Sequence, residues 1–241
     1  MCRSVPVSED MDVTRIIRDR SALSVITFSL GVHRRLLEID IETLEEHISD
    51  VERDFNRRRR KLEESLTRKA ESLSDRDKEE LGDIYSDEFH KLEQLFPTMH
   101  RRSYLLTVMG LLESYLNRLC KYAKVARKLN VDVTDLHGRG VKRAADYLRK
   151  IINVEFPESD EWKEILIAHE IRNLVAHNDG YLKDGSSNQV RAYASRTSRV
   201  TVSEKNEIAL TDEYVPALLE AIRGFADQLV SAMEKALTSN A

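Results

Sequence analysis

A regular stripe of apolar residues in the N-terminal third of the chain does most to limit its fold. Between residues 41 and 73 the apolar positions are mostly three or four residues apart, which is the spacing of one face of an α-helix. One helix cannot bury such a stripe alone, so other helices must cover it. The stripe consists of Ile41, Leu44, Ile48, Val51, Phe55, Leu62, Leu66 and Leu73.

Helical structure is expected through most of the chain. The 241 residues include only 8 glycines and 4 prolines, too few for a turn-rich β-sandwich or barrel. Polar residues at 74–77 separate the long helix from a second one, which Pro97 is expected to end, so that 41–96 forms a helical hairpin. The polar stretch 1–20 predicts an irregular tail, and the more apolar stretch 21–40 is a candidate start of the long helix.

The residues after this hairpin are predicted to form a bundle. Apolar periodicity indicates helices at 99–129 and 141–153. A third helix is expected to start after a cap at Ser159 or Asp160 and to end near 178–180.

A small β-hairpin is expected before the last helix. Residues 199–203 and 208–210 have the composition of short strands and flank a polar four-residue loop, whereas 181–200 reads as a loop up to the first strand. Thr211 or Asp212 is the expected cap of the last helix. The predicted fold class is therefore all-α, with a β-hairpin excursion and a long N-terminal helical hairpin.

Composition narrows the classes of function. The formal net charge is -4, so nucleic acid would have to be bound by a local basic patch. The two cysteines, Cys2 and Cys120, form neither a disulfide framework nor a zinc knuckle, and they suit a reducing compartment. The start of the chain lacks the pattern of a secretory signal, and every apolar run is far shorter than a membrane span. We expect a cytoplasmic protein with no membrane association.

The stretch HEIRNLVAHNDG at 169–180 is the strongest candidate for a functional site. His169, Asn173 and His177 are four residues apart and share a stripe opposite the apolar face of their helix. Arg172 lies on the flank, about 140° from His177 on an ideal helix. Leu166 falls on the same polar stripe, which suggests that another surface covers this face.

Three interpretations of this stretch remain open from the residues alone. The spacing of His169 and His177 suits zinc, but no further histidine or cysteine is nearby to complete a site. A histidine beside an arginine can also move protons and stabilise charge in phosphoryl transfer. The third interpretation is a polar helix end without a site, since histidine and arginine are favourable at the negative end of the helix dipole.

The stretch Arg172-Asn173-Leu-Val-Ala-His177 resembles the R-x4–6-H motif of the HEPN superfamily, which comprises all-α domains found in many RNase toxins and defence proteins. The stretch 101–121 resembles the opening helix of such domains, with Glu113 where many members carry an acid. The segment 200–229 is similar to the hairpin and last helix of some members. The resemblance covers about 99–237, and it suggests an N-terminal extension at 1–98 followed by a HEPN-like bundle at 99–241.

The resemblance implies a metal-independent endoribonuclease without a cofactor. Such an enzyme cleaves RNA by 2′-hydroxyl attack and leaves a 2′,3′-cyclic phosphate, here with Arg172 and His177 as catalytic residues and Asn173, Glu113 and His169 in support. It also implies a homodimer in which the two motif helices face each other, together with an antitoxin or defence-system partner protein. Positive residues on either side of the motif helix are candidate RNA contacts. These are Arg139, Lys142, Arg143, Arg149, Arg191 and Arg196.

A second function, from another class, is also compatible with the sequence. Members of the superfamily include domains that only bind or scaffold. In that case the chain would be a catalytically inactive HEPN-like module that binds a protein or nucleotide, with its helical hairpin as the binding element. Loss of RNA cleavage in variants of Arg172 and His177 would separate the two hypotheses.

Overall fold

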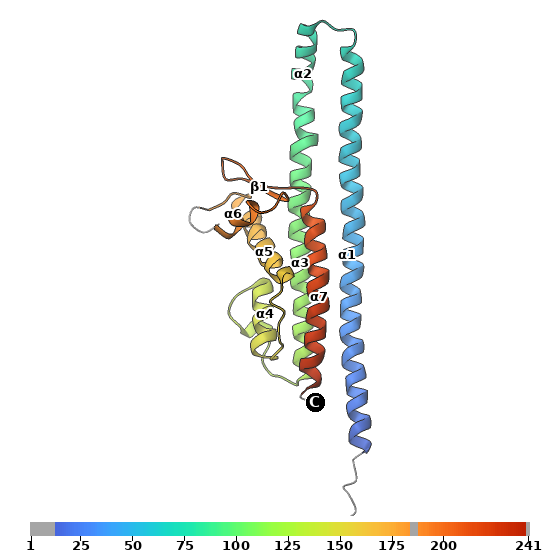
Figure 1. Ribbon diagram of the computed structural model, residues 1–241, viewed down its shortest axis with the longest axis vertical. Coiled ribbons are helices and arrows are strands. Elements are labelled where there is room, and N and C mark those ends of the chain that lie inside the picture. Colours follow the sequence, from blue (N-terminus) through green and yellow to red (C-terminus); the bar gives the residue numbers. More distant parts are fainter. Residues whose placement is uncertain (1–12, 184–187, 240–241) are drawn as a thin grey trace, which may run out of the picture.

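A computed structural model describes residues 13–183 and 188–239 of the chain (Figure 1). The longest element is α1 (Val13–Ala70), and a turn reverses the chain into α2 (Asp75–His90). A short π-helical segment, η1 (Lys91–Leu95), joins α2 to α3 (Phe96–Ala126). These elements form two long antiparallel rods, which project well beyond the rest of the molecule at the α1–α2 turn (Figure 1).

Pro97 does not end a helix, contrary to the expectation from the sequence. A proline has no N–H, and its ring crowds the carbonyl group four residues earlier in a regular α-helix. Here the backbone N–H of Phe96 bonds to the carbonyl of Lys91, five residues earlier. This wider turn accommodates the proline ring. The second arm of the hairpin and the first bundle helix are therefore one continuous rod.

The expected N-terminal tail is also corrected in part. Residues 1–12 lie outside the described residues, whereas 13–20 belong to α1. The stretch 21–40 is helical as well, and Leu30 and Leu37 on its inner face are fully buried.

The bundle is completed by helices that pack around α3. The short 3-10 turn η2 (Val133–Asp135) and α4 (Gly140–Lys150) lie against α3, and α5 (Asp160–Asn178) lies between α3 and α7 (Tyr214–Thr238). Aromatic rings fill the contact of α5 with α7, where the ring centroids of Trp162 and Phe225 are 5.0 Å apart. The predicted all-α fold with a small β excursion is confirmed.

A short helix and a β-hairpin lie between α5 and α7. The strands β1 (Val200–Val202) and β2 (Ile208–Leu210) pair antiparallel, with Val200 opposite Leu210, which confirms the predicted hairpin. The predicted loop before it contains a helix that the sequence analysis missed, α6 (Asn188–Ala194). The last helix begins at Tyr214, after Glu213, which makes no side-chain cap, so neither Thr211 nor Asp212 is its cap.

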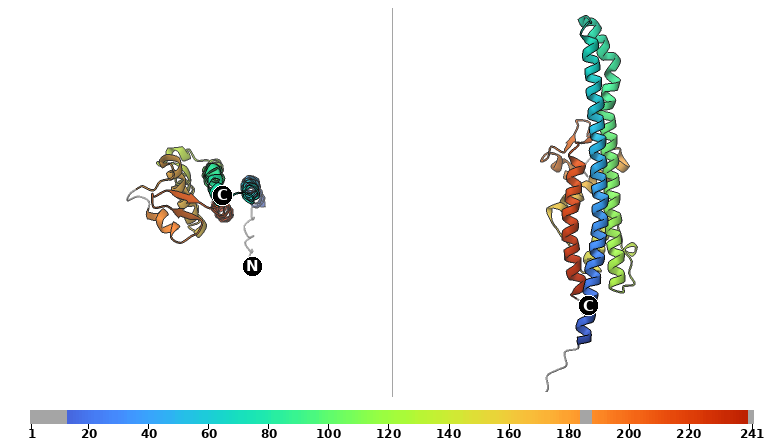
Figure 2. Two further views of the ribbon diagram at one scale, coloured as in Figure 1. Left: turned by 90° about the horizontal axis from the view of Figure 1, so that it is seen from above. Right: turned by 90° about the vertical axis from the view of Figure 1, so that its right-hand side faces the viewer.

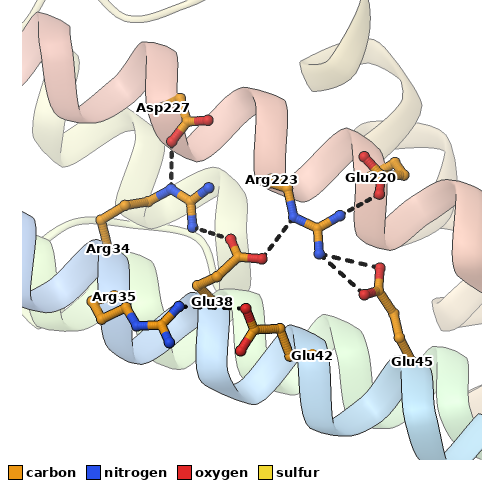
Figure 3. Close-up of polar contacts among 8 residues, drawn as sticks. All are labelled: Arg34, Arg35, Glu38, Glu42, Glu45, Glu220, Arg223 and Asp227. Atoms are coloured by element: carbon orange, nitrogen blue, oxygen red, sulfur yellow. Dashed lines mark hydrogen bonds and ion pairs between the residues drawn. The ribbon is translucent and has the colours of Figure 1, made fainter.

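Ion pairs attach α1 to α7 (Figure 3). Arg223 of α7 donates to Glu38 of α1 at 2.8 Å and to Glu45 at 3.1 Å. Arg34 donates to the same Glu38 at 2.6 Å and also pairs with Asp227. Burial raises the pKa of Glu38, but the hydrogen bonds from Arg34 and Arg223 outweigh it and hold that pKa below its ordinary value. These contacts fix which face of α1 points toward the bundle.

The hydrophobic core is continuous along the molecule. It includes side chains of α1, of α3 and of each later long helix, from Leu30 to Leu237. Within the part of the chain that the structure describes, none of the helices combines the length and the apolar character needed to cross a membrane.

Candidate functional site

Helix α5 has well-defined ends, and both were predicted from the sequence. The Ser159 hydroxyl accepts a hydrogen bond from the backbone N–H of Trp162, which caps the first turn. At the other end Asp179 adopts the left-handed conformation (φ 51°) and Gly180 follows with φ 79°. His177 therefore lies in the last turn of the helix, two residues before the chain changes direction.

The predicted catalytic and supporting residues lie around one cleft of about 650 Å³ between α3, α4 and α5. Arg172 and His177 both line it, so their separation of about 140° on an ideal helix does not keep them apart. The cleft extends around this turn of α5 and so reaches both side chains. Its walls are formed by Met109, Glu113, Arg139, Gly140, Val141, His169, Arg172, Asn173 and His177.

Asn173 connects two of these side chains. Its Oδ1 accepts a hydrogen bond from Nη1 of Arg172 at 3.1 Å. Its Nδ2 lies 3.4 Å from Nδ1 of His169. If Nδ2 donates there, Nδ1 of His169 is the acceptor and the ring proton is on Nε2. One amide thus orients both an arginine and a histidine, which explains why a polar residue directly after Arg172 suits this site.

His169 is held in its neutral form. Burial, with the positive charge of Lys142 as the next cause, lowers the pKa of His169 below its ordinary value. Glu170 and Glu113 act in the opposite direction but do not reverse the shift. Nζ of Lys142 is itself 2.7 Å from the carboxylate of Glu170. A neutral imidazole at this position can accept a proton at physiological pH.

Gly140, directly before the predicted helix at 141–153, is a site residue that sequence reasoning missed. It has φ +62°, and a Cβ at this position would lie 3.4 Å from Nε2 of His169 and 3.6 Å from Oε2 of Glu113. The backbone at the start of α4 therefore lies close to the side chains of His169 and Glu113, because Gly140 has no side chain of its own. A glycine directly before a helical pattern was the only signal in the sequence.

Arg102 is a second residue that sequence reasoning missed. From the first part of α3 it donates to the carbonyl of Asp179 at 3.3 Å and to the carbonyl of Ile208 at 3.0 Å. It also pairs with Glu207 at 2.9 Å. These bonds position the end of α5, and with it His177. Arg102 is 75 residues before His177 in the chain, so no local pattern links the two.

The candidate RNA contacts differ in their surroundings. Arg139 is exposed and lines the cleft, and Arg196 is exposed. Arg191 is also exposed and donates to Asn206 at 2.8 Å. Lys142 pairs with Glu170, and Arg143 is half-buried on α4.

Arg149 has a structural environment instead. Its guanidinium lies 4.2 Å from the ring centroid of Phe156 and pairs with Glu158. The cation–π contact and the ion pair occupy the charge that the sequence analysis assigned to RNA.

The expectation for Leu166 is corrected. Its side chain is partly buried and packs against the core of this chain. Because the leucine is covered within the monomer, it no longer argues for a second molecule over the polar stripe of α5.

A smaller hollow of about 240 Å³ adjoins the cleft on the side of α6. Asn173 and His177 line both hollows, so they lie on the ridge between them. Its other walls come from Glu170, Leu174, Lys183, Gln189 and Val190. A chain-like ligand could pass over this ridge with groups in both hollows.

Within 13–183 and 188–239, no three or more His, Cys, Asp or Glu residues gather as a group that could hold a metal ion. Comparison of the chain with protein-family models, with curated proteins and with solved structures found no significant match.

Proposed function

We propose that this protein is a metal-independent endoribonuclease whose active site is the cleft around Arg172 and His177. The observation that carries the proposal is that Arg172, Asn173, His177, His169 and Glu113, named together from the sequence, line one cleft of one chain. The resemblance of Arg172–His177 to the HEPN motif supplies the reaction, and the geometry supports it by collecting a cation and two imidazoles on one surface.

The proposed reaction is transfer of the phosphoryl group within the RNA. The 2′-hydroxyl oxygen bonds to phosphorus, the bond to the 5′-oxygen breaks, and the products are a 2′,3′-cyclic phosphate and a 5′-hydroxyl end. One group must accept the 2′-hydroxyl proton and one must donate a proton to the leaving oxygen. His177 and His169 are the residues for these transfers, and the forked donors of Arg172 stabilise negative charge on the phosphoryl oxygens.

RNA binding is proposed to rely on a local basic surface, because the whole chain is acidic. Arg139 in the cleft wall is the first candidate to contact a phosphate, followed by Arg191 on α6 and Arg196 just after it. A cytoplasmic setting, an antitoxin or defence partner, and a dimer through α5 belong to the same proposal. The cleft does not need that dimer to bring Arg172 and His177 together.

The test is cleavage of single-stranded RNA in the presence of EDTA. Wild-type protein is expected to nick the RNA and to leave cyclic-phosphate ends, and Arg172→Ala and His177→Ala are each expected to abolish this. His90→Ala and Arg53→Ala change exposed residues on α2 and α1 and are the matched controls. Wild-type protein that leaves RNA intact, or cleavage that survives both site variants, would refute the proposal.

A catalytically inactive binding module is the second candidate, and one observation favours it. The described part of α2 has no buried residue, and Ile84 is 67% exposed on this projecting arm. An arm of this length with apolar side chains at its surface is a candidate binding element for another protein. Under this alternative the arm would retain its partner when Arg172 and His177 are both replaced.

A further inference from the structure

Helix α1 carries a second apolar stripe on the face that points away from the bundle. Val25, Phe28, Val32, Leu36 and Ile39 are 59%, 72%, 41%, 47% and 44% exposed. They follow one another at intervals of three or four residues and lie opposite the buried stripe of the same helix. Beyond Ile39 the exposed face becomes polar. An apolar stripe of five side chains on an otherwise charge-rich chain indicates a surface that another helix covers.

The orientation of this stripe is fixed by contacts on the other side of α1. The ion pairs of Arg34, Glu38 and Glu45 with α7 (Figure 3) hold that face inward. Leu30 and Leu37 are fully buried beside them. The helix cannot rotate to bury the outer stripe without breaking these pairs and exposing these leucines. The outer stripe is therefore a stable feature of the folded chain.

The spacing of the stripe is symmetric about Val32. Phe28 and Leu36 are each four residues from Val32, and Val25 and Ile39 are each seven residues from it. When two copies of such a helix lie antiparallel with a two-fold axis at Val32, each apolar layer of one copy faces an apolar layer of the other. Phe28 then lies opposite Leu36 of the second copy, and Val25 lies opposite Ile39. A self-complementary surface of this kind is what a two-fold dimer requires.

We propose that the outer face of α1 is a homodimer interface that pairs with the same face of a second copy in antiparallel orientation.

The exposed stripe supplies most of the area that such a pairing needs. The five side chains leave on the order of 450 Å² of apolar surface on each copy, or about 900 Å² over two copies. The stems of flanking residues such as Arg35 add to it. The total approaches the ~1,200 Å² at the lower end of specific, stable interfaces.

This dimer differs from one built through the motif helices. In Figure 1 and in the left view of Figure 2, α1 forms one side of the molecule, and α4 and α5 lie across α3 and α7 from it. Pairing through α1 therefore leaves the cleft of each copy open to solvent. The proposal does not depend on what the cleft does.

The first test is the mass of the full-length protein in solution by analytical ultracentrifugation. Wild type is expected to sediment as two 27.8 kDa chains, and Val32→Glu, which places two carboxylates at the axis, is expected to sediment as one. Ile84→Glu changes a 67% exposed residue on α2 and is the matched control, expected to remain dimeric. A monomeric wild type would overturn the proposal, as would a Val32→Glu variant that is still dimeric with an unchanged helical circular dichroism spectrum.

The second test determines orientation and face by cysteine cross-linking in a Cys2→Ser background, with Cys120 buried in the core. A mixture of Val25→Cys chains and Ile39→Cys chains is expected to give the mixed disulfide in preference to either homodisulfide. Predominant Val25→Cys homodisulfide would refute the antiparallel arrangement. Dimers that cross-link only through cysteines on α5 would refute the α1 interface and support the motif-helix dimer.

Discussion

Nη1 of Arg102 donates a hydrogen bond of 3.3 Å to the backbone carbonyl of Asp179, the residue that ends helix α5. The same guanidinium reaches the carbonyl of Ile208 on β2 and the carboxylate of Glu207. One side chain of α3 thereby ties the end of the motif helix to the β-hairpin. Because His177 lies two residues before Asp179, this contact helps to set its position at the cleft.

Gly180→Ala is expected to lower the free energy of unfolding by about 1–3 kcal/mol. Gly180 has φ +79°, and a Cβ on it would lie 2.6 Å from Nη2 of Arg102. The variant must therefore strain the backbone and displace the arginine. Gly110→Ala is the control, because nothing lies within 4 Å of its Cβ position inside α3. It is expected to gain up to about 1 kcal/mol from helix propensity. Equal stabilities in urea denaturation would contradict the role of the Arg102 contact.

Asn173→Ala is expected to raise the pKa of His169 toward its ordinary value. The amide of Asn173 faces Nδ1 of His169, and a donor to that nitrogen favours the neutral ring. Titration of the histidine resonances by NMR measures the change directly and needs no substrate. The same variant is expected to slow RNA cleavage about tenfold or more, because Arg172 also loses its contact with Oδ1. An unchanged pKa of His169 would show that Asn173 does not orient the ring.

Stability is expected to fall as the pH is lowered from 7 to 5. The pKa values of His169 and His33 are lowered in the folded protein, in both cases chiefly by burial. The unfolded chain therefore binds these protons first, near pH ~6.5, and their contribution to stability is present above that pH and lost as the pH falls toward the folded pKa values. His169→Gln should flatten the dependence of Tm on pH over this range. A slope that is unaffected in His169→Gln would contradict this assignment.

Arg223→Met is expected to destabilise the protein by about 1–3 kcal/mol, because it leaves Glu38 and Glu45 partly buried without their shared partner. Arg35→Met removes an exposed pair with Glu42 at 3.4 Å and should cost less than about 0.5 kcal/mol. The free energies of unfolding of the two variants are compared by chemical denaturation at low and at high salt. Similar losses in the two variants would mean that the α1–α7 ion pairs are no stronger than surface pairs.

Arg149→Ala and Arg139→Ala are expected to separate stability from RNA affinity. Removing Arg149 deletes the contact with the Phe156 ring and the pair with Glu158, so Tm should fall while RNA affinity changes little. Arg139 is exposed in the cleft wall, so Arg139→Ala should weaken RNA binding and lower its salt dependence by about one counterion without a change in Tm. The measurements are RNA titrations at several salt concentrations and melting curves. A fall in RNA affinity for Arg149→Ala together with a fall in Tm for Arg139→Ala would contradict both assignments.

Local sequence patterns were sufficient for the long helices and the β-hairpin, although not for the short α6. They were also sufficient for both ends of α5, where the capping residues are neighbours in the chain. Ser159 and the Asp179–Gly180 pair were recognised because a helix cap depends on residues within a turn of each other. The β-hairpin was recognised because only five residues separate its two strands. The apolar intervals of α1 likewise identify a helix whatever it packs against.

Long-range contacts decided the rest. The helix-breaking tendency of proline predicts that a helix ends at Pro97. The π-helical turn before Pro97 and the packing of the buried proline instead keep the rod continuous. On an ideal helix Arg172 and His177 lie on different faces of α5. Only the packing of α3 and α4 around α5 makes both faces part of the wall of one cleft. Arg102 could not be connected with His177 from the sequence, because the two are joined by folding and not by spacing. The sequence determined which segments are helical through local backbone energetics, and the tertiary structure decided which side chains meet, since that depends on the packing of segments far apart in the chain.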